Sequence, residues 1–536
     1  MLNIYVHFHM QEGTKMKENL EYNQQKEQTN SKKRDKKWIN PQNHVKSGDF
    51  PGNKRKNHDK RKIRKKKDDR PNRSVRTVSS AEDVRPRDRI VVTIKRIGIN
   101  GEGVGYYKRK AVFIPGAITG EVVKAQVTKV QSGYLEAKPS EIEKSSPDRQ
   151  IPPCPVFDQC GGCQLQHMTY SSQLAAKEEI VRESFRRYLG DNAGILIRPI
   201  RGMDHPWDYR NKAQLQTEVR DSRVITGLYT PGTHHLVDIS GCLVQDPVIN
   251  HVMQVMKEIV SELDIPVYNE KKRSGVLRTI VARVARSTGK VQLTLITATP
   301  FLPKHEKLVS AVHQRMPEVA EIAHNVNPDD TPLVFGERTV HLSGEDRLEE
   351  TLGPLRFELS PRAFFQLNPS QTVHLYDYVK EAAALTGDEL VVDAYCGTGT
   401  IGLWLAPLAC EVRGIEIIDD AVQDARRNAE RSGLGNARFY TGRAEKLLPQ
   451  WVREGVRPDV VVVDPPRTGC DAALLRAILA AKPPRLVYVS CNPSTLAKDC
   501  RTLLGGGYSA EWVQPVDMFP QTAHVECVIR IQRIDT

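Results

Sequence analysis

The spacing of hydrophobic residues divides the chain into segments of different character. Residues 1–83 hold few apolar positions, and their densest basic part, residues 54–67, has almost none. Such a segment cannot bury a core, so we expect a disordered tail. From about 84 to 143, short runs of β-branched and apolar residues alternate with Gly and Pro, which predicts a small β-barrel.

Residues 144–360 start with prolines and cysteines, followed by a helical pattern over 170–189. Beyond about 200 the apolar runs are longer and typical of strands. The runs 281–284 and 291–296 are joined through Ser-Thr-Gly-Lys, which predicts a hairpin. We therefore expect a mixed central region rich in antiparallel strands.

Residues 361–536 alternate between helix and strand patterns. Helices are expected at 373–385, 400–409 and 420–432, and buried strands at 390–392, 412–415, 460–463 and 486–489. This alternation predicts an α/β fold, a doubly wound Rossmann-like domain with ligand-binding loops at the carboxyl ends of its strands.

Charge is concentrated in the tail. The chain carries a net charge of +13, and residues 1–83 hold 22 Lys and Arg against 11 Asp and Glu, a net +11. A segment of this kind is either an arm that binds nucleic-acid phosphates or a passive solvated tail. No run of about 18 apolar residues occurs, which argues against a transmembrane helix. The first apolar stretch is not preceded by the basic residues that begin a signal peptide, so we expect a cytoplasmic protein without a membrane anchor.

A glycine-rich loop follows the first strand of the alternating region. Residues 397–402 match G-x-G-x-x-G, and Glu416 follows the first glycine by nineteen residues, so a dinucleotide site is one interpretation. However, residues 393–396 separate the strand from the glycines. Asp-x-x-Cys-Gly-x-Gly-Thr is similar to the first motif of S-adenosylmethionine-dependent methyltransferases, which favours that cofactor, with Glu416 accepting the ribose hydroxyls.

Asp464-Pro465-Pro466-Arg467 follows a strand of four valines. Methyltransferases that act on exocyclic amines carry a related Asp/Asn-Pro-Pro followed by an aromatic residue. Because the fourth position here is Arg467, amine methylation is disfavoured. A rigid turn capped by Asp464 is the structural alternative.

Cys491 lies in a Ser-Cys-Asn-Pro turn after a buried strand. Carbon 5 of a pyrimidine is a poor nucleophile until a thiolate adds to carbon 6, so methylation there requires a cysteine. A base must then remove the proton from carbon 5. Glu526 is the candidate, and alternation places it on one face of a terminal strand with His524. Cys410, Cys470, Cys500 and Cys527 are expected to be small buried hydrophobic residues.

A second cysteine group consists of Cys154, Cys160, Cys163 and the distant Cys242. Four thiolates can hold zinc or an iron–sulfur cluster. The unequal spacing is unlike common zinc ribbons and favours a structural four-iron cluster.

From about residue 85 onward these motifs together resemble the RNA (uracil-5-)-methyltransferase family. After the basic tail (1–83), about which the family says nothing, the resemblance implies an RNA-binding TRAM barrel (84–143), an iron–sulfur and RNA-binding region (144–360) and a catalytic domain (361–536). Further matches are Tyr209-Arg210-Asn211-Lys212, Leu277-Arg278 and Asn325-Val326-Asn327-Pro328, whose basic and amide groups could face RNA.

The resemblance also implies functional residues. It places S-adenosylmethionine against Gln366, Tyr395, Glu416 and Asp464, with Cys491 as nucleophile, Glu526 as base, and a [4Fe–4S] cluster on Cys154, Cys160, Cys163 and Cys242. It favours a monomer acting on uridine in 23S ribosomal RNA. A transfer-RNA uridine methyltransferase, an RNA cytosine-5 methyltransferase and a non-enzymatic RNA-binding scaffold are the alternatives.

Overall fold

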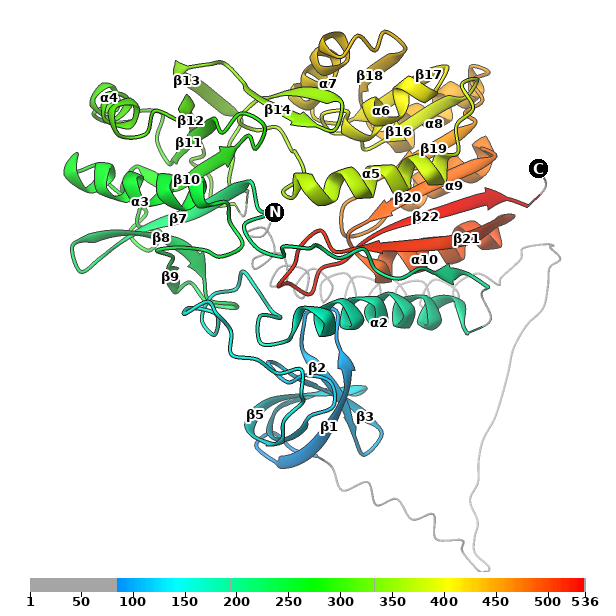
Figure 1. The fold of residues 1–536 in the computed structure, drawn as a ribbon, viewed down its shortest axis with the longest axis horizontal. Coiled ribbons are helices and arrows are strands. Elements are labelled where there is room, and N and C mark those ends of the chain that lie inside the picture. Colours follow the sequence, from blue (N-terminus) through cyan, green and yellow to red (C-terminus); the bar gives the residue numbers. More distant parts are fainter. Residues whose placement is uncertain (1–83, 192–193, 332, 535–536) are drawn as a thin grey trace, which may run out of the picture. The chain divides into compact units, whose positions relative to one another are not determined.

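The computed structural model describes residues 84–191, 194–331 and 333–534 (Figure 1). The predicted basic tail lies outside these residues. Residues from Arg85 onward group into one unit by their contacts. Within the described residues, every helix is too short or too polar to span a bilayer.

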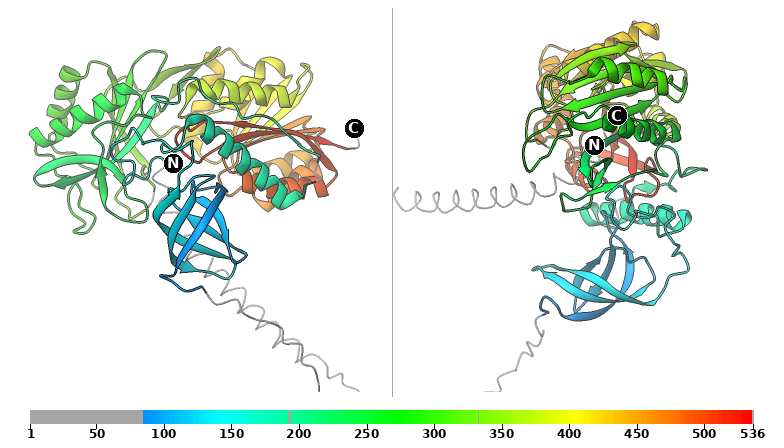
Figure 2. Two further views of the ribbon diagram at one scale, coloured as in Figure 1. Left: turned by 60° about the horizontal axis from the view of Figure 1, so that its bottom comes forward. Right: turned by 90° about the vertical axis from the view of Figure 1, so that its left-hand side faces the viewer.

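The first five strands form a closed barrel, which confirms the small barrel predicted from the sequence. β1 (Arg89–Ile97), β2 (Gly103–Tyr107), β3 (Lys110–Ile114), β4 (Val122–Val130) and β5 (Tyr134–Lys144) pair in the order β1-β2-β3-β5-β4 (Figure 2). Ile90, Val92 and Ile94 are buried between exposed neighbours on β1, so the period of two directs apolar side chains into the barrel.

The middle of the chain builds a seven-stranded sheet. Its strands are β7 (Lys212–Arg220), β8 (Arg223–Tyr229), β9 (Leu236–Asp238), β10 (Leu277–Val284), β11 (Val291–Thr297), β12 (Val319–Val326) and β13 (Arg338–Gly344), in the order β13-β12-β11-β10-β7-β8-β9. The predicted hairpin is β10–β11, with Val284 opposite Val291. One pair, β11–β12, is parallel, and α4 (His305–Arg315) lies between its strands in the chain.

The two faces of this sheet differ. One face packs its apolar residues, such as Leu215 and Leu293, into a core with α3 (Pro247–Glu262) and α4. The other face buries polar residues, among them Arg283 and Gln292. The Arg283 guanidinium donates to the carbonyls of Ser360 and Ala363, so this sheet holds the chain segment that leads to Gln366.

The C-terminal part is doubly wound, as predicted. An eight-stranded sheet runs β18-β17-β16-β19-β20-β22-β21-β6 (Figure 1). The strands are β6 (Leu196–Ile197), β16 (Leu390–Ala394), β17 (Glu411–Glu416), β18 (Ala437–Thr441), β19 (Val460–Val463), β20 (Arg485–Ser490), β21 (Tyr508–Val516) and β22 (Glu526–Arg533). β16 to β20 are parallel, and β22 is antiparallel to both of its neighbours.

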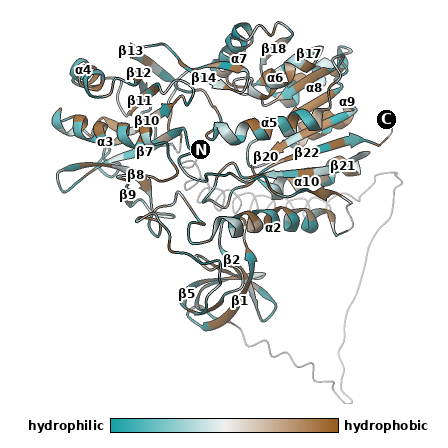
Figure 3. Cartoon of the chain, viewed as in Figure 1, coloured by the Kyte–Doolittle hydropathy of each residue, from teal (hydrophilic) through white to brown (hydrophobic). Residues whose placement is uncertain are grey.

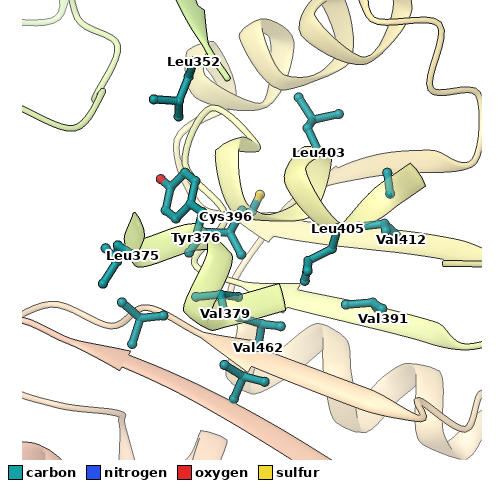
Figure 4. Packing of buried hydrophobic residues seen from close by; sticks show 14 of the residues in the cluster. Leu352, Leu375, Tyr376, Val379, Val391, Cys396, Leu403, Leu405, Val412 and Val462 are labelled. Atoms are coloured by element: carbon teal, nitrogen blue, oxygen red, sulfur yellow. The ribbon is translucent and has the colours of Figure 1, made fainter. Parts of the chain in front are cut away.

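Helices cover both faces of this sheet because its strands are apolar on both sides. Val391 and Val462 face a core with α5 (Pro369–Ala383), α6 (Thr400–Leu405) and α7 (Asp419–Arg431) (Figure 4). Val392 and Val461 face a second core. Its helices are α2 (Tyr170–Leu189), α8 (Ala444–Arg453), α9 (Ala472–Ala481) and α10 (Pro493–Gly505). A small sheet, β14 (Leu348–Leu352) with β15 (Leu355–Leu359), adds Phe357 to the first core.

Two details differ from the sequence prediction. The helix expected over 400–409 ends at Leu405 and continues as a 3-10 turn, Ala406–Leu408, because Pro407 cannot donate the backbone hydrogen bond of an α-helix. β6 lies before the central sheet in sequence but pairs with β21, with Leu196 opposite Trp512. α2 matches its prediction, and hydrophobic and hydrophilic residues are interleaved along it (Figure 3).

Candidate active site

Four predicted site residues lie at one edge of the eight-stranded sheet. Glu416 ends β17, Asp464 follows β19 and Cys491 follows β20, while Tyr395 follows β16. These strands are parallel, so their carboxyl ends meet at a single edge.

The glycine-rich loop is fixed by two carboxylates. Gly397 N–H donates to Glu416 Oε2 at 3.2 Å, and Gly402 N–H donates to Asp393 Oδ2 at 2.8 Å. Tyr395 has a φ of 68°, a left-handed conformation that is unusual for a residue other than glycine and turns the chain sharply after the strand. Asp393 Oδ1 is buried without a hydrogen-bond partner in the described structure. Asp393 Oδ1 could therefore still accept a hydrogen bond at the place where the motif predicts a cofactor.

Gln366 lies between β15 and α5, outside the doubly wound sheet, and its contacts connect it to the same edge. Asn211 Nδ2 donates to the Gln366 carbonyl at 3.2 Å, and the Gln366 side chain hydrogen-bonds to Tyr376. The Tyr376 hydroxyl also lies 2.8 Å from Thr400 Oγ1, at the start of α6. Tyr376 thus links Gln366 to the glycine-rich loop, a role that the helical pattern around it did not indicate.

Buried carboxyl groups dominate the electrostatics of this edge. Burial raises the pKa of Asp464 to about 7. Burial also raises the pKa of Asp393 to about 8, with further contributions from the charges of Asp464 and Glu416. Because a bound cation would stabilise these carboxylates, this edge of the sheet suits a positively charged ligand.

The Cys491 turn is clamped to the Asp-Pro-Pro-Arg corner. Asn492 caps the N-terminus of α10, and its Nδ2 donates to the Arg467 carbonyl at 3.0 Å. Thr495 Oγ1 donates to the same carbonyl at 3.1 Å. Burial raises the pKa of the Cys491 thiol, the negative charges of Glu526 and Asp464 raise it further, and the Arg467 guanidinium opposes them.

Glu526 reaches the same place from β22. Burial raises its pKa to about 8; the charge of Asp464 adds to the rise and Arg467 opposes it. The structure thus brings the predicted nucleophile and the predicted base together beside one guanidinium. Sequence reasoning noted Arg467 only as a departure from an aromatic motif.

His524 corrects one sequence expectation. β22 begins at Glu526, so His524 precedes the strand instead of alternating along it. Its Nδ1 lies 2.8 Å from Arg467 Nη2. Burial and the nearby Arg467 charge lower the pKa of His524 to about 3, so the ring is neutral and its Nδ1 accepts from Arg467.

The second cysteine group also converges. Cys154, Cys160, Cys163 and Cys242 line one cavity together with Tyr209 and Arg210. Gly162 N–H donates to Cys160 Sγ at 3.3 Å, and backbone groups of Val244 and Gln245 bond to the Cys242 sulfur. Burial raises the pKa of Cys160 to about 11, with smaller contributions from Cys242 and Cys154. Such thiols need a cationic centre to ionise.

The described residues contain no group of three or more His, Cys, Asp or Glu arranged to hold a single metal ion. A mononuclear zinc site requires four sulfurs within about 2.3 Å of one point. The four cysteines that line the cavity are a donor set that zinc and iron–sulfur clusters share.

Of the remaining cysteines, Cys500 and Cys527 are buried as expected, and Cys470 is partly buried. Cys410 is exposed, contrary to the sequence expectation. It lies in the short connection between the 3-10 turn and β17, where a side chain is not directed into either core.

Comparison with family models identifies two regions of the chain. Residues 345–534 match the tRNA (Uracil-5-)-methyltransferase model, and residues 84–139 match the TRAM domain. The second match coincides with the five-stranded barrel.

Relatives match over most of the chain. An RNA methyltransferase of Bacillus cereus, described as uncharacterised, is 55% identical over 82% of this chain and 96% of its own. One from Halalkalibacterium halodurans is 55% identical, over 82% of this chain and 95% of its own. The structure resembles the Pyrococcus abyssi tRNA (uracil-54, C5)-methyltransferase bound to S-adenosyl-L-homocysteine, with a TM-score of 0.64, 28% identity, and coverage of 82% of this chain and 100% of that one. The chain belongs to the TRAM-containing RNA (uracil-5-)-methyltransferase family and is an S-adenosylmethionine-dependent enzyme.

Proposed function

We propose that the protein methylates carbon 5 of uridine in 23S ribosomal RNA through a covalent bond between Cys491 and carbon 6. The observation that carries the mechanism is the convergence of Cys491 and Glu526 on Arg467, beside the glycine-rich loop. A scaffold that only bound RNA would have no need for a half-buried thiol and a buried carboxyl at that edge.

The Cys491 thiolate adds to carbon 6, and the pair from the 5,6 double bond moves onto carbon 5 and the carbonyl at carbon 4. Bound S-adenosylmethionine would supply an electrophilic methyl group; as carbon 5 bonds to it, the bond from the methyl group to the sulfonium sulfur would break and S-adenosyl-L-homocysteine would leave. Glu526 then takes the proton from carbon 5, the 5,6 double bond re-forms, and the sulfur–carbon bond breaks to return the thiolate.

Four residues are proposed to bind the cofactor: Gln366, Tyr395, Glu416 and Asp464. Glu416 already accepts from Gly397 and from Ile418 N–H, the latter at 2.9 Å, so its carboxylate is held in one orientation. Asp464, with its raised pKa, would be stabilised as a carboxylate by the positive charge of S-adenosylmethionine.

The four cysteines that line one cavity are proposed to carry a [4Fe–4S] cluster. Their convergence on one cavity, the backbone N–H bond to Cys160 and the nearby Arg210 guanidinium support a site for an anionic metal centre, and the unequal spacing of the cysteines along the chain favours a cluster over zinc. We propose a structural role for it, since it would join the segment 154–163 to Cys242.

The choice of RNA rests on the domain combination. A barrel together with a cysteine-bound cluster favours ribosomal RNA and a monomeric enzyme. Transfer RNA is the second candidate, because the matched family model and the Pyrococcus structure are both described by that substrate. Cytosine-5 methylation is disfavoured by the family match.

Nucleoside mass spectrometry on separated RNAs tests the substrate. A strain lacking the gene should lose 5-methyluridine from 23S ribosomal RNA and keep it in transfer RNA, and restoring the gene should restore the modification. Loss from transfer RNA alone would reject the ribosomal assignment.

Cys491→Ala tests the mechanism. It should lower methyl transfer by more than about 10³-fold while S-adenosylmethionine still binds, because removing a nucleophile leaves binding contacts in place. Cys410→Ala, at an exposed cysteine, is the matched control and should retain full activity. Turnover by the Cys491 variant would reject covalent catalysis.

A further inference from the structure

The loop between β21 and β22, residues 517–525, leads directly into Glu526 and is held from one side by α2. Lys177 Nζ lies 2.5 Å from Asp517 Oδ1, and both side chains are fully buried. The Tyr170 hydroxyl donates to Asp517 Oδ2 at 2.9 Å. A fully buried ion pair with a further hydrogen bond fixes the start of the loop in one arrangement.

The middle of the loop is held by a reciprocal pair of hydrogen bonds. Gln521 N–H donates to Gln173 Oε1 at 3.0 Å, and Gln173 Nε2 donates to Gln521 Oε1 at 2.9 Å. Gln521 has a φ of 70°, a conformation that a non-glycine residue keeps only when its surroundings impose it. Gln173, which is also buried, supplies that constraint through its two hydrogen bonds.

The same residue contacts the cysteine-rich segment. Gln164 N–H and Leu165 N–H both donate to the Gln521 carbonyl, at 3.0 Å and 2.9 Å. These donors directly follow Cys163. Thr522, the next residue of the loop, lines the cavity shared by the four cysteines. The loop is therefore part of the wall of the proposed cluster site.

Only three residues separate Thr522, in the cavity wall, from the proposed base Glu526, and hydrogen bonds hold this short segment in place. His524 N–H donates to Thr522 Oγ1 at 3.2 Å, and the His524 ring accepts from Arg467. Glu526 follows two residues later at the first position of β22. Each link in this series is a hydrogen bond or a covalent bond.

We propose that Gln173, Gln521 and Thr522 are positioning residues that couple the cluster-binding segment to the placement of His524 and Glu526. Occupation of the cysteine site then controls removal of the carbon 5 proton. S-adenosylmethionine binding should change less than proton removal, because the glycine-rich loop lies between β16 and α6, away from residues 517–525 in the chain.

This inference rests on the proposed function, since it assigns Glu526 as the base. It also gives a role to the buried contacts between α2 and residues 517–525, which are more than 300 residues apart in the sequence. A displacement of about 1 Å can cost about 10²-fold in rate, so modest loosening of the loop should be visible in the proton-removal step.

The test uses Gln173→Ala and Thr522→Val in the full chain, with Glu526→Gln as reference and Gln254→Ala, an exposed glutamine on α3, as matched control. In a single turnover with substrate RNA, the lifetime of the protein–RNA adduct is followed on denaturing gels. Cluster absorption near 400 nm and S-adenosylmethionine affinity are measured on the same samples.

We expect Gln173→Ala and Thr522→Val to keep the colour and the cofactor affinity while the adduct decays about 10- to 100-fold more slowly than in wild type. Gln254→Ala should match wild type. Cys163→Ser, which removes a cluster ligand, should show the same slow decay with unchanged cofactor affinity.

If the adduct decayed at the wild-type rate in both Gln173→Ala and Thr522→Val but persisted in Glu526→Gln, the coupling would be overturned and the proposed function would stand. No adduct in Glu526→Gln would overturn both. If Gln173→Ala lost the cluster absorption, its slow adduct decay could come from cluster loss. The adduct lifetime of the isosteric Thr522→Val variant would then decide whether the coupling holds.

Discussion

At the scale of single residues, Arg467 connects the two groups on which the chemistry depends. Its positive charge opposes the rise in the pKa of both Cys491 and Glu526, and its carbonyl anchors the turn that carries Cys491. A neutral His524 accepts from its guanidinium. One arginine thus lessens, without reversing, the rise in pKa that burial gives the Cys491 thiol and the Glu526 carboxyl.

The raised pKa of Glu526 predicts how resolution of the adduct depends on pH. A base must be ionised, and with a pKa of about 8 the ionised fraction grows about ten-fold per pH unit below that value and levels off above it. Decay of the methylated adduct should follow this profile. Cys491 does not contribute to it, because its sulfur is bonded to carbon 6 at this stage.

Rapid mixing from a pre-formed adduct into buffers between pH 6 and pH 9 measures this decay directly. A rate that is constant over the range would exclude a carboxyl base with the raised pKa of Glu526.

Much of the site was predictable at this scale because its chemistry is local. A cysteine in a turn after a buried strand and an acid at a strand end are visible in the sequence. The role of Arg467 was missed because its partner His524 lies 57 residues further along the chain, and that of Tyr376 because the helical pattern around it does not indicate its bond to Gln366.

At the scale of elements, the cysteines join two segments. Cys154, Cys160 and Cys163 precede α2, whereas Cys242 precedes α3. The four line one cavity although 78 residues separate Cys163 from Cys242. A ligand held by all four would restrict both segments.

Removing one of the four cysteines should therefore prevent the proposed cluster from binding. Anaerobically purified protein should be brown, with broad absorption near about 400 nm, and Cys163→Ala or Cys242→Ala should bleach it, because a four-iron cluster uses four thiolates. Cys410→Ala should leave the colour unchanged. A colourless wild-type protein with stoichiometric zinc and no iron would contradict the assignment.

Elements with strong periodicity were predicted well, including the barrel, the β10–β11 hairpin and α2. Pairings between distant segments were not. The two residues of β6 have no pattern of their own, and the parallel pair β11–β12 depends on a crossover through α4. Such pairings arise from tertiary packing, which local periodicity does not encode.

At the scale of the whole molecule, charge is divided unevenly. The first 83 residues carry +11 of the net +13, and the remaining 453 residues are nearly neutral. Binding to RNA phosphates should accordingly draw on the tail, whereas selection of the uridine should depend on the folded part.

Deleting residues 1–83 should weaken RNA binding at low salt and flatten its salt dependence. If about six to ten phosphates are contacted, affinity changes by orders of magnitude between about 50 and 200 mM salt, with a slope near −0.7 per contact on single strands. The modified uridine and the maximal rate at saturating RNA should not change. Equal salt slopes for full-length and shortened protein in filter-binding titrations would identify the tail as passive.

The most direct measurement of covalent uridine methylation is the mass of the protein–RNA species formed by Glu526→Gln with S-adenosylmethionine and substrate RNA. Glutamine cannot accept the carbon 5 proton, so addition and methyl transfer should proceed and the adduct should persist through denaturation. We predict one RNA and one added methyl group per protein, with the linkage at Cys491. A Glu526→Gln protein that turns over normally, or that forms no adduct with an RNA the wild-type enzyme methylates, would contradict the account.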